Sequence, residues 1–451
     1  MFMLLFTTKE ARADEWIRYY LNDVTSEGTI IRHYKDSVDI VCCHNSSGPY
    51  FIVYKDGVVS SSVLYLHGDM EDIDTICDFE IFNDTIYFCG RKSTFNPIGA
   101  VVGYYDVSAL LSMASVNVNY IPISTVDIVN AMEVGTFASR KHVVGVGENN
   151  KSKQVVVDLI DETTHWDVYY GEIGGDTILL SDLAITNKKI IVTSVRTGSL
   201  TIPAGQIWHF PKPTVPGSSL FPCTVLYDII KNSFGINGKF LVKAATQDSF
   251  ITVNRNKVSI PAENSFTISY YKILNYKNVV VSEEAEGISL LGDFDIDSIT
   301  QDIGLLVYRK HKNTPGLTRS SVIYEIPDIY PIPSFVQTHV YKDVLFSSLD
   351  YIDCVDSYCG YYVSSGFRSP GYDTPYYMRF RKNFFDGYCL DKTESPARNI
   401  ALDHDYSFID VTGTLVQPET VELLKYLKNV NVKTECHSYR TMDDEGSDQQ
   451  D

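Results

Sequence analysis

Aspartate recurs at regular intervals along this chain, beside short apolar segments, and it is the residue type best placed to do chemistry. Asp78, Asp182, Asp293 and Asp350 each accompany an alternating apolar segment of the kind that forms a strand. Carboxylates gathered around one axis would repel one another and could hold a cation or a cationic ligand. The recurrence itself favours a structural role, in which each aspartate bonds a neighbouring backbone, because a residue that serves one active site need not recur.

Asp293, Asp295 and Asp297 form the densest acidic motif, D-x-D-x-D. On a strand this spacing puts three carboxylates on one face, and carboxylate oxygens are the ligands that Ca²⁺ prefers. The motif fails as an EF-hand loop, because Ser298 stands at its sixth position and Gly304 at its twelfth. The favoured interpretation is that Asp293 is a structural anchor and that Asp295 and Asp297 are solvated, and a calcium site is the alternative. No other cofactor is expected.

Aromatic residues crowd the segment 351–379, together with two arginines. Aromatic faces with polar groups between them suit stacking on sugars or capture of peptides, and Tyr and Arg are favoured at binding hot spots. Glycines and a proline predict an exposed loop over residues 364–373. We therefore expect Phe367, Arg368 and Tyr372 to bind ligand, whereas the other aromatics are expected to fill the core.

Motifs of the common enzyme classes do not occur in the sequence. It has no GxSxG nucleophile elbow, no HExxH metalloprotease motif and no GxxxxGK[ST] phosphate loop. The most compact acid–base cluster, Asp403-His404-Asp405, is expected to be a polar turn. Catalytic residues stay unassigned, because a carboxylate pair for glycoside hydrolysis is defined by its separation in space.

The nine cysteines include no CxxC pair and no zinc-like Cys/His spacing. Cys354 and Cys359 flank four residues, and a turn at Asp356-Ser357 would set them opposite each other on one face of a hairpin. A disulfide between them requires an exported protein, and two buried free thiols are the favoured interpretation.

Short strands in a degenerate repeat must position all these residues. The anchor positions 78, 132, 182, 245, 293 and 350 lie 48 to 63 residues apart. The repeat predicts groups of three strands over residues 38–66, 75–107, 127–160, 177–210, 240–273, 290–326 and 346–381. A repeat of this length made only of strands is typical of a β-propeller blade. We therefore predict an all-β protein, a β-propeller for which seven blades are favoured and six or eight stay compatible with the pattern.

The C-terminal part of the chain carries three further expectations. The segment 399–415 is expected to pair with the segment 16–34 and complete a blade from both termini, which would remove the open edges of a circular array. Pro418–Lys428 is the clearest helix candidate, with acidic residues in its first turn and Lys in its last. Residues 14–440 would then form a single propeller domain that includes this helix at about 418–428, and residues 441–451 a disordered acidic tail.

The first 13 residues are expected to be a truncated signal peptide. Ala11-Arg12-Ala13 has the small-x-small form of a cleavage site and follows an apolar run, but the basic start is missing. This expectation places the protein in the periplasm or outside the cell. The net charge of −19 disfavours nucleic acids and anionic membranes as partners, and no apolar segment reaches the roughly 18 residues of a membrane span.

The chain resembles the uncharacterised secreted β-propeller proteins of gut Bacteroidetes. The resemblance rests on Trp16-Ile17-Arg18-Tyr19-Tyr20 after the export-like start, on the Asp-aromatic-x-Ile anchors, and on strands such as Thr85–Gly90. It extends over nearly the whole chain. It implies a propeller fold and export, and because no activity accompanies it, it assigns no site residues.

A non-catalytic binding module is the favoured function. Its ligand would be an extracellular or periplasmic glycan, peptide or protein, bound by loops on the propeller rim. The alternative is an enzyme, a hydrolase or lyase that acts on glycans or peptides at the mouth of the central channel, and a structural role in surface assembly is a third class. Carboxylates or a histidine that converge at one mouth with shifted pKa values would favour the enzyme, whereas aromatic rim loops alone would favour binding.

Overall fold

A computed structural model shows that the chain is built almost entirely of antiparallel strands. It describes the strands named below, one helix, and residues 34–35, 83–84, 126–127, 186–187, 247–248, 297 and 301–302. In the described part, no helix is long and apolar enough to cross a membrane. The prediction of an all-β protein is therefore confirmed.

Successive strands form four-stranded antiparallel meanders. Ordered from the first strand to the fourth, the meanders are β2 (Glu27–His33), β3 (Val38–Asn45), β4 (Gly48–Lys55), β5 (Val58–His67); β6 (Ile73–Phe82), β7 (Thr85–Lys92), β8 (Gly99–Asp106), β9 (Val116–Ile123); β10 (Ile128–Phe137), β11 (Arg140–Asn149), β12 (Lys153–Ile160), β13 (Thr164–Tyr170); β14 (Thr177–Ile185), β15 (Lys189–Thr197), β16 (Ala204–Pro211), β17 (Phe221–Ile229); β18 (Gly235–Thr246), β19 (Ser249–Lys257), β20 (Asn264–Lys272), β21 (Asn275–Glu283); β22 (Gly287–Ile296), β23 (Ile303–His311), β24 (Ser320–Ile326), β25 (Phe335–Lys342); and β26 (Val344–Ile352), β27 (Tyr361–Arg368), β28 (Pro375–Arg381), β1 (Ala13–Tyr20).

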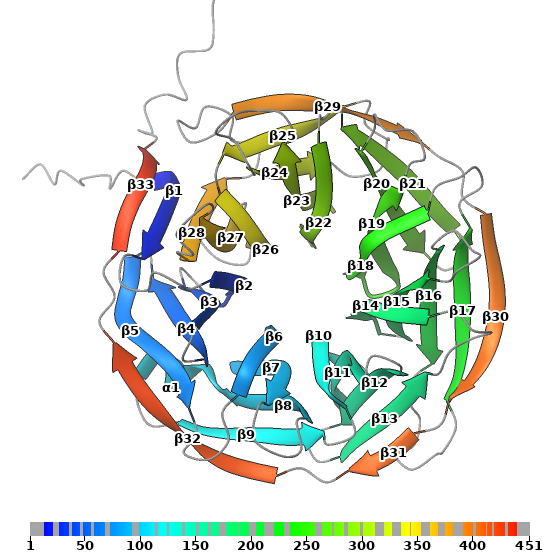
Figure 1. Cartoon of the computed structure of the whole chain (residues 1–451), viewed down its shortest axis with the longest axis horizontal. Helices are drawn as coiled ribbons and strands as arrows, with labels where there is room; N and C mark the ends of the chain where they lie inside the picture. Colours follow the sequence, from blue (N-terminus) through cyan, green and yellow to red (C-terminus); the bar gives the residue numbers. More distant parts are fainter. Residues whose placement is uncertain are drawn as a thin grey trace, which may run out of the picture.

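The meanders stand side by side in a propeller-like arrangement, with the first strand of each nearest the centre (Figure 1). Each inner strand contacts the inner strand of the next meander, from β2 through β6, β10, β14, β18 and β22 to β26, and β26 contacts β2. Six of the seven three-strand groups predicted from the repeat match the first three strands of a meander, and the group over residues 38–66 matches β3, β4 and β5, the second to fourth strands of the first meander. The repeat predicted neither the inner strand β2 nor the outer strands of the other six meanders.

A C-terminal series of strands lies along the outside of the meanders (Figure 1). Its members are β29 (Asp391–Asn399), β30 (Asp403–Val411), β31 (Gly413–Val416), β32 (Glu419–Lys428) and β33 (Val432–Tyr439). They meet the meanders in reverse chain order, and β29 and β32 each pair with the outer strands of two meanders. We call this series the belt.

Two predictions about the ends of the chain are corrected by the belt. The segment 399–415 pairs with β17 and β13 and not with the N-terminal segment. β1 does complete the last meander, where it pairs with β28 and with β33. The predicted helix at about 418–428 is strand β32, because the outer edges of β5 and β9 offer it backbone partners on both sides and tertiary pairing overrides a helix propensity of a few tenths of a kcal/mol per residue.

The core lies between neighbouring meanders. Phe51 on β4 and Phe79 on β6 are fully buried, with their rings edge-to-face and their centroids 5.2 Å apart. Burial of one such ring contributes about 1.5–3 kcal/mol. A second apolar cluster joins β18–β20 to β22–β24 in the same way. The sole helix of the described part, α1 (Val107–Ser112), packs Val107 and Leu110 against the first cluster.

Most inner strands carry a β-bulge at a corresponding place. The register slips at Cys77 in β6, Asn130 in β10, Ser181 in β14 and Gly292 in β22. Similar slips occur in β2, β18 and β26. A bulge sets two residues opposite one and re-aims the side chains that follow it, so these slips decide what faces the centre.

Candidate functional site

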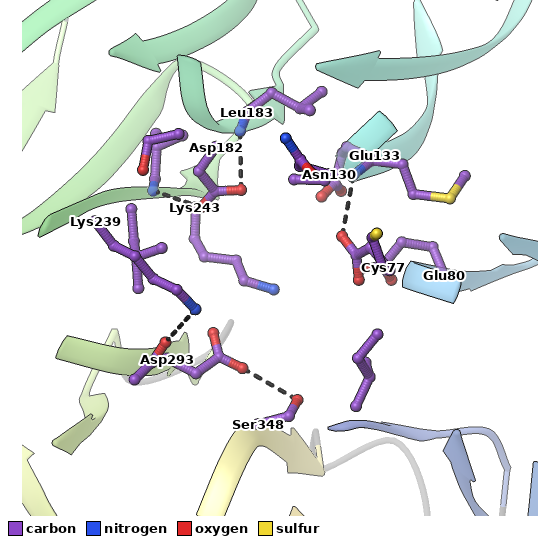
Figure 2. A pocket seen from close by; sticks show the side chains of 18 of the residues that line it. Cys77, Glu80, Asn130, Glu133, Asp182, Leu183, Lys239, Lys243, Asp293 and Ser348 are labelled. Carbon is purple, nitrogen blue, oxygen red and sulfur yellow. Dashed lines mark hydrogen bonds between the residues drawn. The ribbon is translucent and has the colours of Figure 1, made fainter. Parts of the chain in front are cut away.

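A cavity of about 240 Å³ lies among the inner strands, and charged side chains line it (Figure 2). The acidic members of the lining come from β6, β10, β14 and β22, and they are Asp78, Glu80, Glu133, Asp182 and Asp293. The basic members come from β2 and β18, and they are Arg32, Lys239 and Lys243. Asp295 and Asp350 lie close enough to interact electrostatically with Arg32 or Lys243. We call this site the axial cavity.

The bulges explain why aspartates reach the axial cavity from different meanders. Asp78, Asp182 and Asp293 each follow the bulged residue of their strand directly. The next residues, Phe79, Leu183 and Phe294, are buried. Side chains alternate along a strand, so the aspartates face the centre while the apolar residues pack between meanders.

Each of these aspartates also fastens its meander to the next one. One carboxylate oxygen accepts the N–H of the residue that follows the aspartate, at 2.9 Å in all three cases. The other oxygen accepts an N–H from the next inner strand: Asp78 from Met132 at 3.0 Å, Asp182 from Val242 at 2.9 Å and Asp293 from Leu349 at 3.0 Å. The predicted anchoring role is confirmed.

The contact between the first and last meanders uses the same device. Asp350 on β26 accepts the backbone N–H of His33 on β2 at 2.5 Å. The His33 ring in turn lies 2.8 Å from Asp39, and the hydroxyl of Tyr377 on β28 donates to Asp39 at 2.6 Å. Buried polar groups that are all bonded fix one arrangement, so this network sets the register of β2 against β26 and β28.

Arg32 neutralises one side of the axial cavity. Its guanidinium donates to Glu80 at 2.8 Å and to Asp78 at 3.0 Å, and its side chain is only 10% exposed. Burial opposes the charge of Arg32, but the carboxylates of Glu80, Asp78 and Asp350 outweigh it and raise the arginine pKa well above its ordinary value. Arg32 is therefore committed to these carboxylates and stays charged.

Burial raises the pKa values of four carboxyl groups in and around the axial cavity. Removal from bulk water raises the pKa of Asp78 to about 6, that of Asp182 to about 7 and that of Glu133 to about 8, and the Glu80 charge adds to the effect at Asp78 and Glu133. Burial likewise raises the pKa of Asp350 well above its ordinary value. At neutral pH the cavity thus holds protons that a positive ligand could displace.

Lys243 projects its ammonium group into the middle of the axial cavity (Figure 2). Its nearest carboxylate oxygen belongs to Asp295, 3.9 Å away, which is too long for a hydrogen bond. Burial opposes the ammonium charge, yet Asp295, Glu80 and Asp293 raise the lysine pKa. Lys239 differs, because its ammonium donates to the carbonyl of Gly292 at 3.2 Å and ties β18 to β22.

The acidic motif at residues 293–297 does not form a metal centre. Asp293 bonds Leu349 and Ser348, Asp295 lies beside Lys243, and Asp297 is 2% exposed. Among the described residues, no three His, Cys, Asp or Glu side chains are grouped so that they could hold a metal ion. The calcium alternative therefore has no support in the described part of the chain.

The expected rim site is only partly described. Phe367 and Arg368 belong to strand β27 and pair with β26, so residues 364–368 of the predicted loop are strand. Tyr372 lies outside the described residues, as do Cys354, Cys359, the leader over residues 1–12 and the tail 441–451. The register next to the two cysteines, Ile352 opposite Tyr361, is the one that their predicted pairing requires.

Several residues of the site escaped the sequence analysis. Arg32, Glu133 and Lys243 line the site but were not singled out from the sequence. Elsewhere in the chain, Asp403-His404-Asp405 was expected to be a turn and instead opens strand β30. Arg32 and Glu133 each lie three residues after the bulge of their strand, so alignment of the bulges would have found both. Lys243 follows Val242 as Glu133 follows Met132, and both preceding residues donate to an aspartate of the neighbouring inner strand. The bulge of β18 spans several residues, so counting from the bulge would have missed this lysine.

No protein-family model and no curated protein matches the chain.

Proposed function

We propose that this protein is a non-catalytic binding module whose axial cavity binds a positively charged side chain of a peptide, a lysine ammonium or an arginine guanidinium. The observation that supports this most directly is the charge of the lining, where five carboxyl groups face three basic groups. Arg32 and Lys239 are already bonded within the protein. Above about pH 8, where Asp182 and Glu133 are largely ionised, five carboxylates against three cations leave a negative potential in the cavity, and low-dielectric walls concentrate such a potential.

The converging carboxyl groups also meet the criterion for an enzyme, yet most of them are occupied. Asp78, Asp182 and Asp293 accept backbone N–H groups, and Glu80 accepts from Arg32. Hydrolysis by the usual carboxylate mechanism needs two carboxyl groups that are free to move a proton and attack or activate water. Occupied carboxylates can still attract a cation, so binding is the better-supported function.

The test is calorimetric titration of the full chain with trilysine amide and with its side-chain-acetylated form, at pH values from 6 to 9. We expect only the charged peptide to bind. Its affinity should rise with pH, by roughly tenfold per unit at most for each carboxyl that must lose a proton, because the cation competes with protons on Asp182 and Glu133. Equal affinity for both peptides, or an affinity that falls as the pH rises, would contradict the proposal.

Matched variants locate the site in the same titration. Glu133→Gln should remove much of the rise between pH 7 and 9. Asp84→Asn, an exposed acid in the β6–β7 turn that bonds Tyr34 and Lys35, should leave the rise unchanged. A rise that persists in Glu133→Gln and disappears in Asp84→Asn would place the binding site elsewhere.

A hydrolase that acts on glycans or peptides is the second candidate. It is favoured by Glu133, whose raised pKa of about 8 would keep it protonated at neutral pH and able to act as a general acid. A glycan and peptide array with product detection in the same wells separates the two functions. Released product that Glu133→Gln abolishes would favour the enzyme, and saturable binding without product would favour the module.

The finer architecture belongs to this proposal as well. We propose that the ring is closed and has seven blades, each a four-stranded meander. The contact of β26 with β2 and the bond from Asp350 to His33 support closure. The belt supports it further, because it joins neighbouring meanders at their outer edges.

A further inference from the structure

Two exposed leucines occupy equivalent positions on inner strands. Leu179 on β14 is 42% exposed and Leu290 on β22 is 49% exposed, whereas most large apolar side chains of the described part are buried. Each leucine lies two residues before the bulge of its strand and three before the aspartate that lines the axial cavity, Asp182 or Asp293. The two positions therefore correspond in the repeat.

The strand geometry directs both leucines to the cavity side. Without a bulge, residues two apart share a face, and the extra residue of the bulge makes that spacing three. The intervening residues Leu180 and Leu291 are only 8% and 5% exposed and pack into the core. Leu179 and Leu290 consequently stand one step before the aspartates on the same face.

Both leucines lie toward the same end of the axial cavity. The meanders repeat one strand order, so their inner strands run in the same direction and their first residues gather at one end. β14 and β22 flank β18, which carries Lys243. Ile128 on β10 holds the same position relative to its own bulge and is half-buried, which extends the apolar surface along this end.

We infer that Leu179 and Leu290 form an apolar collar at one end of the axial cavity and that the ligand is an alkylammonium group, whose hydrocarbon stem lies on the collar while its charge enters the cavity. This inference rests on the proposed function and names the chemistry of the ligand. Exposed leucines beside buried carboxyl groups complement a group with an apolar stem and a charged head, as in an unmodified lysine side chain.

A homologous series of n-alkylammonium ions, from ethyl to hexyl, tests the collar by calorimetric titration of the full chain at pH 8. We expect the affinity of the natural protein to rise about twofold to fourfold per methylene group, the upper figure being that for full burial of the methylene. The double variant Leu179→Ser/Leu290→Ser should bind ethylammonium as before and lose most of the rise with chain length. Unchanged ethylammonium affinity also shows that the variant is folded.

Leu111→Ser is the matched control, because Leu111 is 41% exposed but lies on helix α1 and not on an inner strand. It should keep the full dependence on chain length. The collar is overturned if the double variant keeps the dependence of the natural protein, or if the natural protein binds ethylammonium and hexylammonium equally, and both results leave the proposed function intact. Failure of every alkylammonium ion to bind overturns the collar, and the titration with trilysine amide then decides the proposed function separately.

Discussion

At the scale of single residues, the aspartates of the inner strands have two roles at once. Asp182 accepts two backbone N–H groups, from Leu183 and from Val242, and it also lines the axial cavity. Burial makes this carboxyl group costly to ionise, and the charge of Asp78 adds to that cost, while the N–H bonds favour its charged form. The same side chain therefore links the binding chemistry to the stability of the fold.

Removal of the Asp182 carboxylate should destabilise the protein. In Asp182→Ala the N–H of Val242 loses its acceptor, and an unsatisfied buried donor costs about 1–3 kcal/mol. We expect the free energy of unfolding, measured by urea denaturation at pH 6, to fall by that amount. Asp84→Asn serves as control and should lose much less stability, since surface ion pairs contribute little and Asn tolerates the positive φ of this turn residue. Equal losses in the two variants would show that the bond to Val242 adds nothing.

At the scale of elements, glycines on second strands make room for the bulges of the inner strands. Gly90 lies opposite Ile76 and Gly147 opposite Val129, each just before a bulge. A β-carbon added to Gly147 would lie 2.0 Å from the backbone oxygen of Ile128, and one added to Gly90 would lie 1.8 Å from the oxygen of Thr75. Backbone cannot yield as a flexible side chain can, so these glycines are required by the bulge.

Gly147→Ala should therefore cost several times more stability than an ordinary strand substitution. We expect a loss of more than about 3 kcal/mol in urea denaturation, the size typical of a severe steric clash. Gly135→Ala is the control on β10 of the same hairpin, because its new methyl group would meet only the side chain of Ile185, at 3.1 Å, and that side chain can shift. If Gly147→Ala proves as mild as Gly135→Ala, the bulge does not depend on this glycine.

At the scale of the whole molecule, the buried titratable groups set the pH of greatest stability. Asp78, Asp182 and Glu133 have pKa values in the folded state of about 6, 7 and 8, above their ordinary values. Their contribution to the free energy of unfolding is complete below about pH 4 and is lost as the pH rises through those pKa values. His44 and His209 have the opposite pH dependence, because burial lowers the pKa of each to about 4. Their contribution to the free energy of unfolding is therefore lost as the pH falls below about 6.5.

Three carboxyl groups against two histidines predict a net decline of stability from about pH 4.5 to pH 8, and above about pH 6.5 only the carboxyl groups contribute to it. For Glu133 alone, the free energy of unfolding declines by at most about 1.4 kcal/mol per pH unit. Water in the cavity screens the charge and makes the decline smaller. The check is the free energy of unfolding by urea at half-unit steps from pH 5 to pH 8.5. Glu133→Gln should flatten the upper part of the curve, and Asp84→Asn should leave it unaltered. A stability that rises steadily from pH 6 to pH 8 would contradict the burial of these carboxyl groups.

The sequence by itself determined the local pattern of this protein. Alternating apolar residues and turn residues placed three strands of each meander correctly, and the turn at Asn83-Asp84, where φ is 48° and 62°, sets Asp78 opposite Cys89. Local alternation and turn chemistry suffice for such hairpins, because their partners are neighbours in the chain.

Only the tertiary structure decided the rest. β32 has the composition of a helix and became a strand because the distant edges of β5 and β9 satisfy its backbone. Residues of β2, β6, β10, β14, β18, β22 and β26 line the axial cavity together, and no local pattern states which side chains of distant strands meet. Long-range pairing and burial create both the belt and the shifted carboxyl groups, so neither could be inferred from periodicity along the chain.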